Sequence, residues 1–569
     1  MQIKSSAESH QYDAIVIGSG MSGGWAAKEL CEAGLKTLVI ERGPMVKHGE
    51  YPTANWNPWD IPYRGEMPYQ DNTDNPVVNK CYAYNKTTEH FFVKDQFHPY
   101  QQDKPFDWIR GYQVGGKSLL WARQTQRWSN YEFEAPERDG FAVDWPIRYK
   151  DLESWYSYVE KFVGICGDRD GIDNLPDSEV MPGFALNCVE KHIQEKIHQK
   201  YQSSRRVIIG RCAHLTEPKD IHLEQGRGRC QRRTLCERGC PYGGYFSSVS
   251  STLPWAAKTG KLTIQPDSVV HSIIYDQEKL KASGVRVIDV NTKEATEYFA
   301  KIIFVNAATI NTNLILLNSI SDRFPHGLSN DQGILGHYIG FHNYRGNVSA
   351  TMEGFEDKYY YGRRPTQAFV PSFRNVRKQE TDFLRGYMSY YIAYRPGWHQ
   401  GYGESGFGED LKTAINDPGP WQIAVGMQGE TVPIYENHVR LSESLVDPWG
   451  IPQIITSVGY TANDDKMVQD FISQGTEMME IAGCKIKAAY DNHQAPGLDI
   501  HEMGGVRMGR DPKTSMLNEW NQLHQCKNVF VTDGACMTSV GNQNPSLTFM
   551  AITARAANRA VDELKRGNI

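Results

Sequence analysis

Long hydrophobic runs are missing from this sequence. No stretch approaches the roughly 18 consecutive apolar residues that a membrane-spanning helix needs, and the mean hydropathy is −0.55. Residues 1–10 contain neither the apolar core of a secretory signal peptide nor a twin-arginine pair. We therefore expect no direct membrane span and no signal peptide in this chain, so any export must depend on a partner.

A strong excess of charge of one sign is also missing. The 61 Lys and Arg residues nearly balance the 67 Asp and Glu residues, for a formal net charge of −6. This balance excludes the basic surface on which nucleic-acid binding depends. No internal repeat or low-complexity linker interrupts the 569 residues. Because a chain of this length exceeds one simple core, at least two domains are expected.

The sequence does contain a glycine-rich turn near its N-terminus. Residues 15–17 form a short apolar run, typical of a strand buried on both faces. Gly18 then permits a tight turn, Gly20 lets the backbone approach a pyrophosphate, and Gly23 lets the following helix pack closely on the strand. The N–H groups at the start of that helix are expected to face the phosphates of a dinucleotide.

The residues after this turn complete the pattern. The helix that starts at the turn is expected to continue over residues 25–33 and to end at Gly34, a second strand follows over residues 36–40, and Glu41 stands at the end of that strand. A carboxylate at this place can accept hydrogen bonds from an adenosine ribose. The order strand, turn, helix, strand and acid predicts a dinucleotide site, although it does not distinguish FAD from NAD.

A candidate catalytic pair, His501 and Asn544, lies at the other end of the chain. His501 begins the run His-Glu-Met-Gly-Gly, and Asn544 follows 43 residues later with Pro545 directly after it. An imidazole with an unperturbed pKa of about 6.5 suits removal of a proton from an alcohol, and an uncharged amide can donate its N–H to the alcohol oxygen. Pro545 favours an extended backbone at Asn544 and so fixes the direction of the amide. Glu502 is expected at the surface or in a hydrogen bond rather than as the base.

Further segments make the chain similar to the glucose–methanol–choline (GMC) oxidoreductases, a family of FAD enzymes. Residues 111–121 resemble the second glycine-rich loop of the family, and residues 529–534 resemble its late strand ending in Asp-Gly. Residues 304–314 resemble in some positions its strand and small-residue turn, with Thr309 and Asn313 in place of the usual glycine and proline. The resemblance implies an α/β (α+β overall) fold, in which a Rossmann-like FAD-binding domain is interleaved with a substrate domain built on a mostly antiparallel sheet. The residues it implies for FAD binding are Gly18, Gly20, Gly23, Glu41, Gly115, Gly116, Ser118, Asp533, Gly534, Asn544 and Pro545.

Within the family, His501 and Asn544 are similar to the His/Asn pair of pyranose oxidase and cholesterol oxidase. The overall pattern resembles most the large subunits of bacterial sugar and glucoside dehydrogenases. This resemblance implies oxidation of a secondary alcohol of a sugar or glycoside to a ketone, with C3 as one candidate position, by proton abstraction and hydride transfer to flavin N5. Leu120 stands where pyranose oxidase has the histidine that bonds covalently to FAD, so the FAD is expected to be non-covalent.

Residues between these motifs predict the substrate domain and its boundaries. Strands are expected over residues 388–394 and 422–427, and an amphipathic helix over residues 463–482. The FAD-binding domain is predicted to comprise three separate segments, residues 8–50, 206–340 and 495–569, of which the second contains a cysteine loop at 226–243 and the third contains the catalytic motifs. Residues 51–205 are predicted to form a mixed cap and flavin-loop region, and residues 341–494 the substrate-binding domain.

Three of the eleven cysteines are clustered, whereas the others are scattered. Cys230, Cys236 and Cys240 have the spacing Cys-x5-Cys-x3-Cys. Three glycines help the same loop to fold: Gly226, Gly228 and Gly239. Its charged residues are one acid, Glu237, and the five arginines Arg227, Arg229, Arg232, Arg233 and Arg238. Such positive charge is expected to lower the pKa of the thiols and to offset an anionic cluster. Three thiolates favour a [3Fe-4S] cluster over zinc or a four-iron cube, which usually take four ligands.

Similar cysteine spacing occurs in the iron–sulfur-bearing large subunits of bacterial glucose and fructose dehydrogenases. This resemblance implies that electrons pass from FAD through the cluster to an acceptor such as a cytochrome c. It also implies a small companion subunit that exports the complex to the periplasm, with a cytoplasmic location as the alternative. A zinc site that uses His214 or His222, or three free cysteines, stays open.

Two other functions stay open at this point. The first is an FAD sugar oxidase that uses O2 and lacks a cluster. The three clustered cysteines are the sequence feature that distinguishes a dehydrogenase from such an oxidase. The second is a flavin-bearing structural or electron-transfer subunit without a substrate of its own, against which the presence of both His501 and Asn544 argues.

Overall fold

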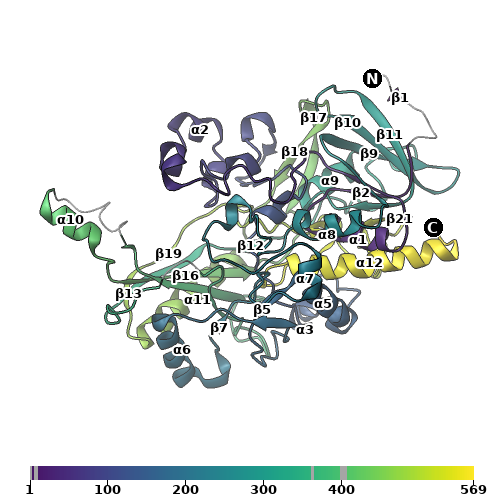
Figure 1. Ribbon diagram of the computed structural model, residues 1–569. Coiled ribbons are helices and arrows are strands. Elements are labelled where there is room, and N and C mark those ends of the chain that lie inside the picture. Colours follow the sequence, from purple (N-terminus) through teal and green to yellow (C-terminus); the bar gives the residue numbers. More distant parts are fainter. Residues whose placement is uncertain (1–2, 5–9, 361–363, 398–406) are drawn as a thin grey trace.

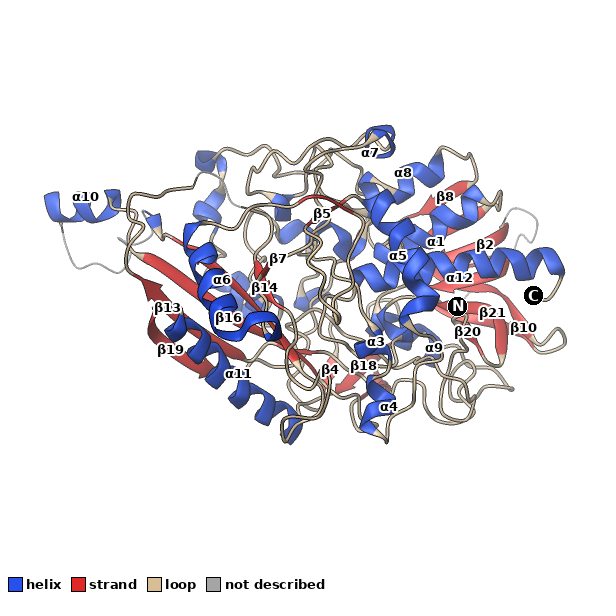
Figure 2. Cartoon of the chain, turned by 90° about the horizontal axis from the view of Figure 1, so that it is seen from below, coloured by secondary structure: helices blue, strands red, loops and turns tan. Residues whose placement is uncertain are grey.

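The computed structural model describes residues 3–4, 10–360, 364–397 and 407–569. Two large sheets lie toward opposite ends of an elongated molecule, as both Figure 1 and Figure 2 show. Segments from the N-terminus, the middle and the C-terminus of the chain contribute to the nine-stranded sheet.

The nine-stranded sheet has a parallel centre. Five parallel strands follow one another in the order β21-β11-β2-β3-β8, and the antiparallel pair β9–β10 extends from β11. The strands of this sheet are β1 (Ile3–Lys4), β2 (Gln11–Ile17), β3 (Thr37–Ile40), β8 (Leu262–Gln265), β9 (Ser268–Asp276), β10 (Lys281–Asp289), β11 (Ala295–Val305), β20 (Gln522–Leu523) and β21 (Cys526–Val531).

Burial on both faces explains why β2 reads as a continuous apolar run. Ile15 and Ile17 belong to one hydrophobic cluster, whereas Ala14 and Val16 belong to another. Successive side chains of a strand point to opposite faces, so both faces of the sheet need cover. Helices that contact one another near this sheet are α1 (Met21–Glu32), α5 (Tyr149–Val163), α8 (Thr252–Ala257) and α12 (Ser546–Arg566).

The seven-stranded sheet is antiparallel throughout, in the order β19-β13-β16-β15-β14-β7 with β12 paired to β16. Its core includes apolar side chains of α11 (Ala462–Ile481) and α6 (Cys188–Tyr201), which pack against it. The strands are β7 (Ile208–Ile209), β12 (His342–Asn343), β13 (Gly346–Met352), β14 (Ala368–Val370), β15 (Tyr387–Tyr394), β16 (Trp421–Glu430) and β19 (Lys485–Asp491).

Smaller elements connect the two sheets. A three-stranded and a two-stranded sheet are built from β4 (Gln101–Gln102), β17 (His438–Val446), β18 (Pro452–Ser457), β5 (Ile165–Gly167) and β6 (Val180–Pro182). The other α-helices are α2 (Tyr69–Asp74), α3 (Asn130–Phe133), α4 (Ala135–Asp139), α7 (Asp220–Glu224), α9 (Thr309–Leu317) and α10 (Glu409–Asn416). Among the described residues, no helix has the length and apolar character needed to cross a membrane.

These elements confirm the predicted fold class: a parallel Rossmann-like sheet and an antiparallel second sheet. The helix expected to follow the glycine turn and continue to residue 33 is α1, which ends at Glu32, and the expected helix at 463–482 is α11 within one residue at each end. The domain boundaries stay a prediction. One strand from the 206–340 segment, β7, pairs with β14 of the second sheet.

Candidate active site

A large cavity lies between the two sheets. It has a volume of about 770 Å³, within the usual range for cofactor and substrate sites. Its walls bring together segments that are far apart in the sequence: the first glycine turn, residues 116–123, the cysteine loop, the β12–β13 region, and both His501 and Asn544. The tertiary structure therefore places all the predicted chemistry around one space.

The glycine turn after β2 is shaped for close approach. A methyl group on Gly18 would lie 2.3 Å from the carbonyl oxygen of Asn306, and one on Gly23 would lie 2.0 Å from the carbonyl oxygen of Gly18. A methyl group on Gly20 would meet nothing within 4 Å, because Gly20 faces the cavity at the start of α1. Gly18 and Gly23 thus hold helix and strand together, and Gly20 keeps space for a ligand at the helix N-terminus.

Two buried carboxylates flank this turn. Glu41 lines the cavity and accepts hydrogen bonds from the Ser19 N–H (3.1 Å), the Ser19 hydroxyl (2.5 Å) and the Gly43 N–H (3.1 Å). Burial raises the pKa of Glu41 even though these donors oppose the shift. Asp533 accepts hydrogen bonds from the Thr312 hydroxyl (2.5 Å) and the Ala535 N–H (3.0 Å), and burial raises its pKa to about 6. Both carboxylates line the cavity as acceptors, which suits ribose and ribityl hydroxyls.

The second glycine loop packs directly on the first. The Gly115 N–H donates to the Ser19 hydroxyl (2.9 Å), and Gly116 begins the short 3₁₀ helix η6 (Gly116–Leu119) next to Gly20. The Ser118 hydroxyl donates to the Gly115 carbonyl (2.6 Å) and accepts from the Ser248 N–H (3.0 Å). Gly116 and Ser118 line the cavity with Gly534 and Pro545, whereas Gly23 and Gly115 support the lining from behind.

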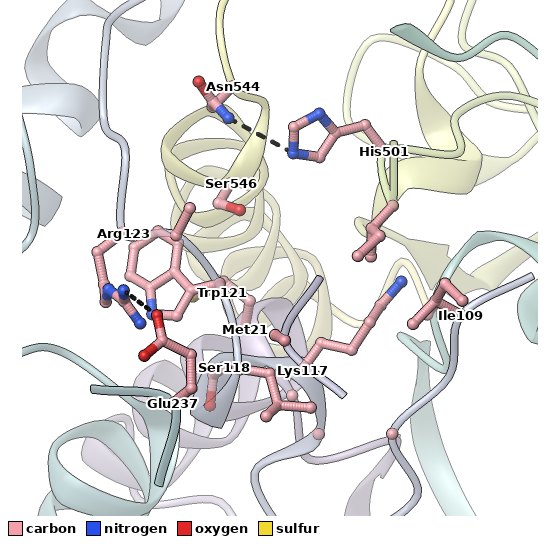
Figure 3. Close-up of a pocket in the computed structure, with 18 of the residues that line it drawn as sticks. Met21, Ile109, Lys117, Ser118, Trp121, Arg123, Glu237, His501, Asn544 and Ser546 are labelled. Carbon is pink, nitrogen blue, oxygen red and sulfur yellow. Dashed lines mark hydrogen bonds and ion pairs between the residues drawn. The ribbon is translucent and has the colours of Figure 1, made fainter. Parts of the chain in front are cut away.

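His501 and Asn544 lie beside each other and both line the cavity, as Figure 3 shows. The Asn544 amide nitrogen lies 3.5 Å from His501 Nε2, and the Asn544 carbonyl oxygen has no hydrogen-bond partner. Burial, with smaller contributions from His342 and Lys117, lowers the pKa of His501 well below its ordinary value of 6.5. The imidazole is therefore neutral near pH 7, the form that can accept a proton.

The loop that carries His501 is held by residues on both sides. A methyl group on Gly504, which has φ +91°, would lie 2.2 Å from the Tyr338 carbonyl oxygen. Asn313, which replaces the usual proline of the family turn, donates to the carbonyls of Thr309 (2.8 Å) and Gly504 (3.2 Å). The departure from the family pattern at Asn313 thus connects α9 to the catalytic loop.

Glu502 is neither a base candidate nor a surface residue. Its side chain is 4% exposed and lies 3.4 Å from Lys117 Nζ. Of the two expected alternatives, a surface position or a hydrogen bond, the structure has the second, because Lys117 Nζ donates to the Glu502 carboxylate. The ion pair with Lys117 joins the second glycine loop to the catalytic loop.

The second sheet contributes polar residues that sequence reasoning missed. Tyr344, Asn347 and Gln428 line the cavity opposite the glycine turns, as do Gln124, Arg364, Gln367 and Tyr390. The Tyr344 hydroxyl donates to Gln428 Oε1, and Gln428 Nε2 donates to the Asn542 carbonyl (2.8 Å). Because these residues follow no motif spacing, only the strand pairing of β13, β15 and β16 brings them together.

The three clustered cysteines lie on the wall of the same cavity. Cys236 belongs to the 3₁₀ helix η8 (Cys236–Arg238), and its Sγ lies 3.8 Å from His214 Nε2. Gly239 has φ +84°, and a methyl group there would lie 2.4 Å from the Tyr51 ring. Burial raises the pKa of Cys230, and it raises that of Cys236 to about 11. The expected lowering of thiol pKa by arginine is wrong for these two residues, because desolvation outweighs the nearby positive charge.

Two buried arginines contact the cysteine region. Arg227 is 1% exposed, and one of its terminal nitrogens has no hydrogen-bond partner. Arg123 is 5% exposed, pairs with Glu237 (3.3 Å), and has two nitrogens without partners. Arg123 was missed at the sequence level, and its only signal is its position three residues after Leu120. Buried guanidinium N–H groups without acceptors fit an anionic group beside the thiols.

The zinc alternative finds less support in this geometry. His222 Nδ1 accepts from the Lys219 N–H (3.0 Å) and its Nε2 donates to the Lys161 carbonyl (3.0 Å), so neither nitrogen is free. Over the residues that the structure describes, only one group of three His, Cys, Asp or Glu residues has ligand atoms within 4.8 Å of one another, and it does not include a cysteine. The thiols are thus not gathered around one ion.

Comparison with known proteins identifies the family. The N-terminal GMC oxidoreductase model matches residues 12–339, and the C-terminal GMC oxidoreductase model matches residues 433–553. The chain belongs to the GMC oxidoreductase family. It is therefore a flavin-dependent oxidoreductase of alcohols or sugars, and FAD is its cofactor.

Relatives of known function span the whole chain. The 2-methyl-1,2-propanediol dehydrogenase of Mycolicibacterium austroafricanum is 26% identical over 96% of this chain and 95% of its own length. The fructose dehydrogenase large subunit of Gluconobacter japonicus is 24% identical over 99% of this chain and 100% of its own length. The solved structure of pyridoxine 4-oxidase from Mesorbium loti has a TM-score of 0.59 at 15% identity, and the match covers 96% of this chain and 98% of that chain, which supports the fold alone.

The residues of the cavity fit FAD. The open space at Gly20, the acceptors Glu41 and Asp533, and the unpaired Asn306 amide nitrogen all lie along the wall. The phosphates of a dinucleotide would lie at Gly20, and its hydroxyl groups would donate to the two carboxylates. Other acceptor atoms of the dinucleotide would bind the Asn306 amide nitrogen. The Asn306 amide nitrogen has no other partner and Gly20 leaves space for a ligand, whereas the two carboxylates already accept hydrogen bonds from the chain and keep further lone pairs for hydroxyl groups.

Proposed function

We propose that this GMC oxidoreductase is a dehydrogenase that oxidises a secondary hydroxyl of a sugar or glycoside to a ketone, with C3 as the first position to test. One observation carries the proposal: amide and hydroxyl side chains of the second sheet meet His501 and Asn544 in one cavity. Amide groups donate and accept at once, so they suit the several hydroxyls of a sugar.

In this proposal, each residue of the pair has a defined task. His501 Nε2 accepts the hydroxyl proton, and the Asn544 amide holds the alcohol oxygen with its N–H. FAD, when bound, supplies the acceptor for the hydride that leaves the carbon. The neutral state of His501, which burial favours, makes the imidazole ready to accept the proton at neutral pH.

The test is anaerobic flavin reduction across a panel of sugars and glycosides, followed by identification of the keto product. Aldoses, ketoses and 3-deoxy glycosides test the class and the position, and 2-methyl-1,2-propanediol serves as the non-sugar control. Rapid bleaching by a sugar with a ketone product supports the proposal. Bleaching by the small diol alone would contradict the sugar assignment.

The electron route belongs to the same proposal. A [3Fe-4S] cluster held by Cys230, Cys236 and Cys240 would pass the electrons, one at a time, to an external acceptor such as a cytochrome c. The unpaired nitrogens of Arg123 and Arg227 support an anionic group at this place. In the view of Figure 3, Trp121 lies between the His501–Asn544 pair and the Arg123–Glu237 pair. For the location of the protein we propose two alternatives. Either a small companion subunit brings the complex to the periplasm, or the protein is cytoplasmic.

Iron and sulfide analysis of anaerobically purified protein, with paramagnetic resonance after oxidation, tests the cluster. Three irons per FAD and a signal of the oxidised three-iron cluster are expected. A protein with full FAD content, no iron and rapid peroxide formation in air is instead a sugar oxidase.

A further inference from the structure

A second histidine, His342, lies directly behind His501. It belongs to β12, is fully buried, and does not line the cavity. Its Nδ1 lies 2.8 Å from Nδ1 of His501, and its Nε2 lies 3.0 Å from the carbonyl oxygen of Gly541. The two rings are nearly perpendicular, with an interplanar angle of 85°. Both nitrogens of His342 are thus engaged, and one of them holds the candidate base.

The Gly541 carbonyl determines where the proton of His342 lies. A carbonyl oxygen only accepts, so His342 Nε2 must carry the hydrogen. A neutral imidazole has only one N–H, so Nδ1 of His342 is an acceptor. The 2.8 Å contact then requires a hydrogen on Nδ1 of His501.

We propose that His342 is a positioning residue that fixes the tautomer of His501, with the proton on Nδ1 and the lone pair of Nε2 directed toward Asn544 and the cavity. The inference deepens the proposed function, since it concerns the same base and rests on its role. Without an acceptor at this place, a neutral histidine exchanges between two tautomers, and only one of them presents a bare Nε2. The Asn544 amide, 3.5 Å from Nε2, is placed to donate to that bare nitrogen.

The surroundings keep His342 neutral and in place. Asp499 accepts from the backbone N–H groups of both His342 (3.0 Å) and His501 (3.2 Å), so one carboxylate aligns the two backbones. Burial lowers the pKa of His342 to about 3. A charged His342 would donate from both nitrogens and force the opposite tautomer on His501. The other titratable groups that face the pair are Glu502, Lys117 and Tyr344.

A metal ion between the same residues does not account for this geometry. His342, Asp499 and His501 offer ligand atoms within 4.8 Å of one another. Two nitrogens bound at about 2.0–2.1 Å to one tetrahedral ion lie roughly 3.3 Å apart, whereas these two lie 2.8 Å apart. The shorter separation is that of a hydrogen bond.

A matched pair of variants tests the inference by kinetics. Leu and Asn have nearly the same shape, but only Asn offers an acceptor near the former Nδ1. In holoenzyme, His342→Leu should lower kcat for anaerobic flavin reduction roughly 10-fold or more with a smaller change in KM, and His342→Asn should recover most of the loss. Equal rates in His342→Leu and His342→Asn would overturn the proposal.

A spectroscopic readout tests the tautomer without any substrate. In holoenzyme labelled with ¹⁵N-histidine, wild-type His501 should show a protonated Nδ1 and a bare Nε2, and His342→Leu should shift the population toward a protonated Nε2. The His501→Asn spectrum assigns the signal. A wild-type His501 protonated on Nε2 would contradict the inference even if sugar is oxidised. If no sugar reduces the flavin, or if His342→Leu fails to fold, the wild-type spectrum still shows which nitrogen of His501 carries the proton and so tests the inference.

Discussion

At the scale of single residues, the candidate base depends on burial more than on its own chemistry. His501 is one of 17 histidines, and its neutral state comes from desolvation with added repulsion from Lys117. Asn544 adds an uncharged donor and leaves its own carbonyl oxygen unpaired. The pair therefore combines a proton acceptor and a hydrogen-bond donor without adding a charge to the cavity.

Replacing His501 should separate cofactor binding from chemistry. We expect His501→Ala to keep its FAD but to reduce it with sugar at least about 10²-fold more slowly, because a general base is lost. Asn544→Ala should be slowed less, since one oriented donor is lost. Stopped-flow absorbance under anaerobic conditions measures both. His493→Ala, at a side chain that is 82% exposed, is the control, and a wild-type rate in His501→Ala would show that the base is elsewhere.

The pH dependence of flavin reduction should follow the lowered pKa of His501. The protonated imidazole cannot accept a proton, and its fraction stays small until the pH falls through a pKa well below 6.5. The rate is thus expected to be flat from about pH 8 to about pH 6.5 and to fall only at lower pH. Asp499, whose pKa burial raises to about 7, faces the same pair. If the rate already halves near pH 7 and Asp499→Asn abolishes that step, Asp499 and not His501 controls the profile.

At the scale of elements, two glycines in one turn have different tasks. Gly23 is required because α1 packs on the carbonyl of Gly18, whereas Gly20 has open space beside it. The same distinction holds between Gly115, which supports the second loop, and Gly116, which faces the cavity. The sequence already predicts packing for Gly23 and ligand approach for Gly20, and the structure adds the same division between Gly115 and Gly116.

Alanine substitutions at Gly20 and Gly23 should therefore differ. Gly23→Ala puts a methyl group 2.0 Å from a backbone oxygen, so we expect a lower melting temperature in the presence and absence of FAD, by several degrees or more. Gly20→Ala should leave the melting temperature of the FAD-free protein unchanged and weaken FAD binding about 10-fold or more. Differential scanning fluorimetry and FAD titration measure the two effects. Identical behaviour of both variants would contradict this division.

The cysteine loop forms a second test at this scale. We expect Cys236→Ser to lose iron while keeping FAD and the anaerobic rate of flavin reduction, because Cys236 belongs to η8 and lies beside His214, whereas His501 and Asn544 lie beside each other in segments before α12. Reduction of a cytochrome c should then fall at least about 10-fold. Cys188→Ser, at the start of α6 and away from the cavity, is the matched control. Equal iron content in both variants would rule out a cluster at this loop.

At the scale of the whole molecule, the active site exists only because three distant segments of the chain meet. The glycine turns come from the nine-stranded sheet and residues near it, the polar wall comes from the seven-stranded sheet, and the catalytic pair comes from the loops before α12. Binding of FAD between these segments should stabilise the folded chain by linkage.

Denaturation of the protein should release FAD in unmodified form. Leu120 lines the cavity at the position where a covalent link would form, and its side chain has no nucleophilic atom. Acid or heat precipitation should therefore release all the flavin into the supernatant, where its absorbance and chromatographic mobility match free FAD. A pellet that stays yellow after acid washing would show a covalent link.

The sequence by itself determines the individual helices, strands and turns that depend on residues close together in the chain. The apolar run of β2, the glycine turn and α1 follow from residues 14–32, and the amphipathic period of residues 462–481 is sufficient to predict α11. That His501, Asn544 and several of the motif residues assigned to FAD binding line one cavity agrees with the motifs, because each belongs to a short run whose residues are adjacent in the chain. For Glu502 the sequence left a surface position and a hydrogen bond open, and only the structure shows that the side chain is buried against Lys117.

Only the tertiary structure decides what surrounds these motifs. His342 and His501 are 159 residues apart, and Arg123 and Glu237 are 114 residues apart, so no local pattern relates them. The pKa values also depend on the folded state, since the five arginines of the loop predict acidic thiols while burial raises the pKa of Cys230 and Cys236. Desolvation is a property of the packed interior and not of the residue, and for that reason the protonation states of this site, on which its chemistry depends, could be derived only after the chain was folded.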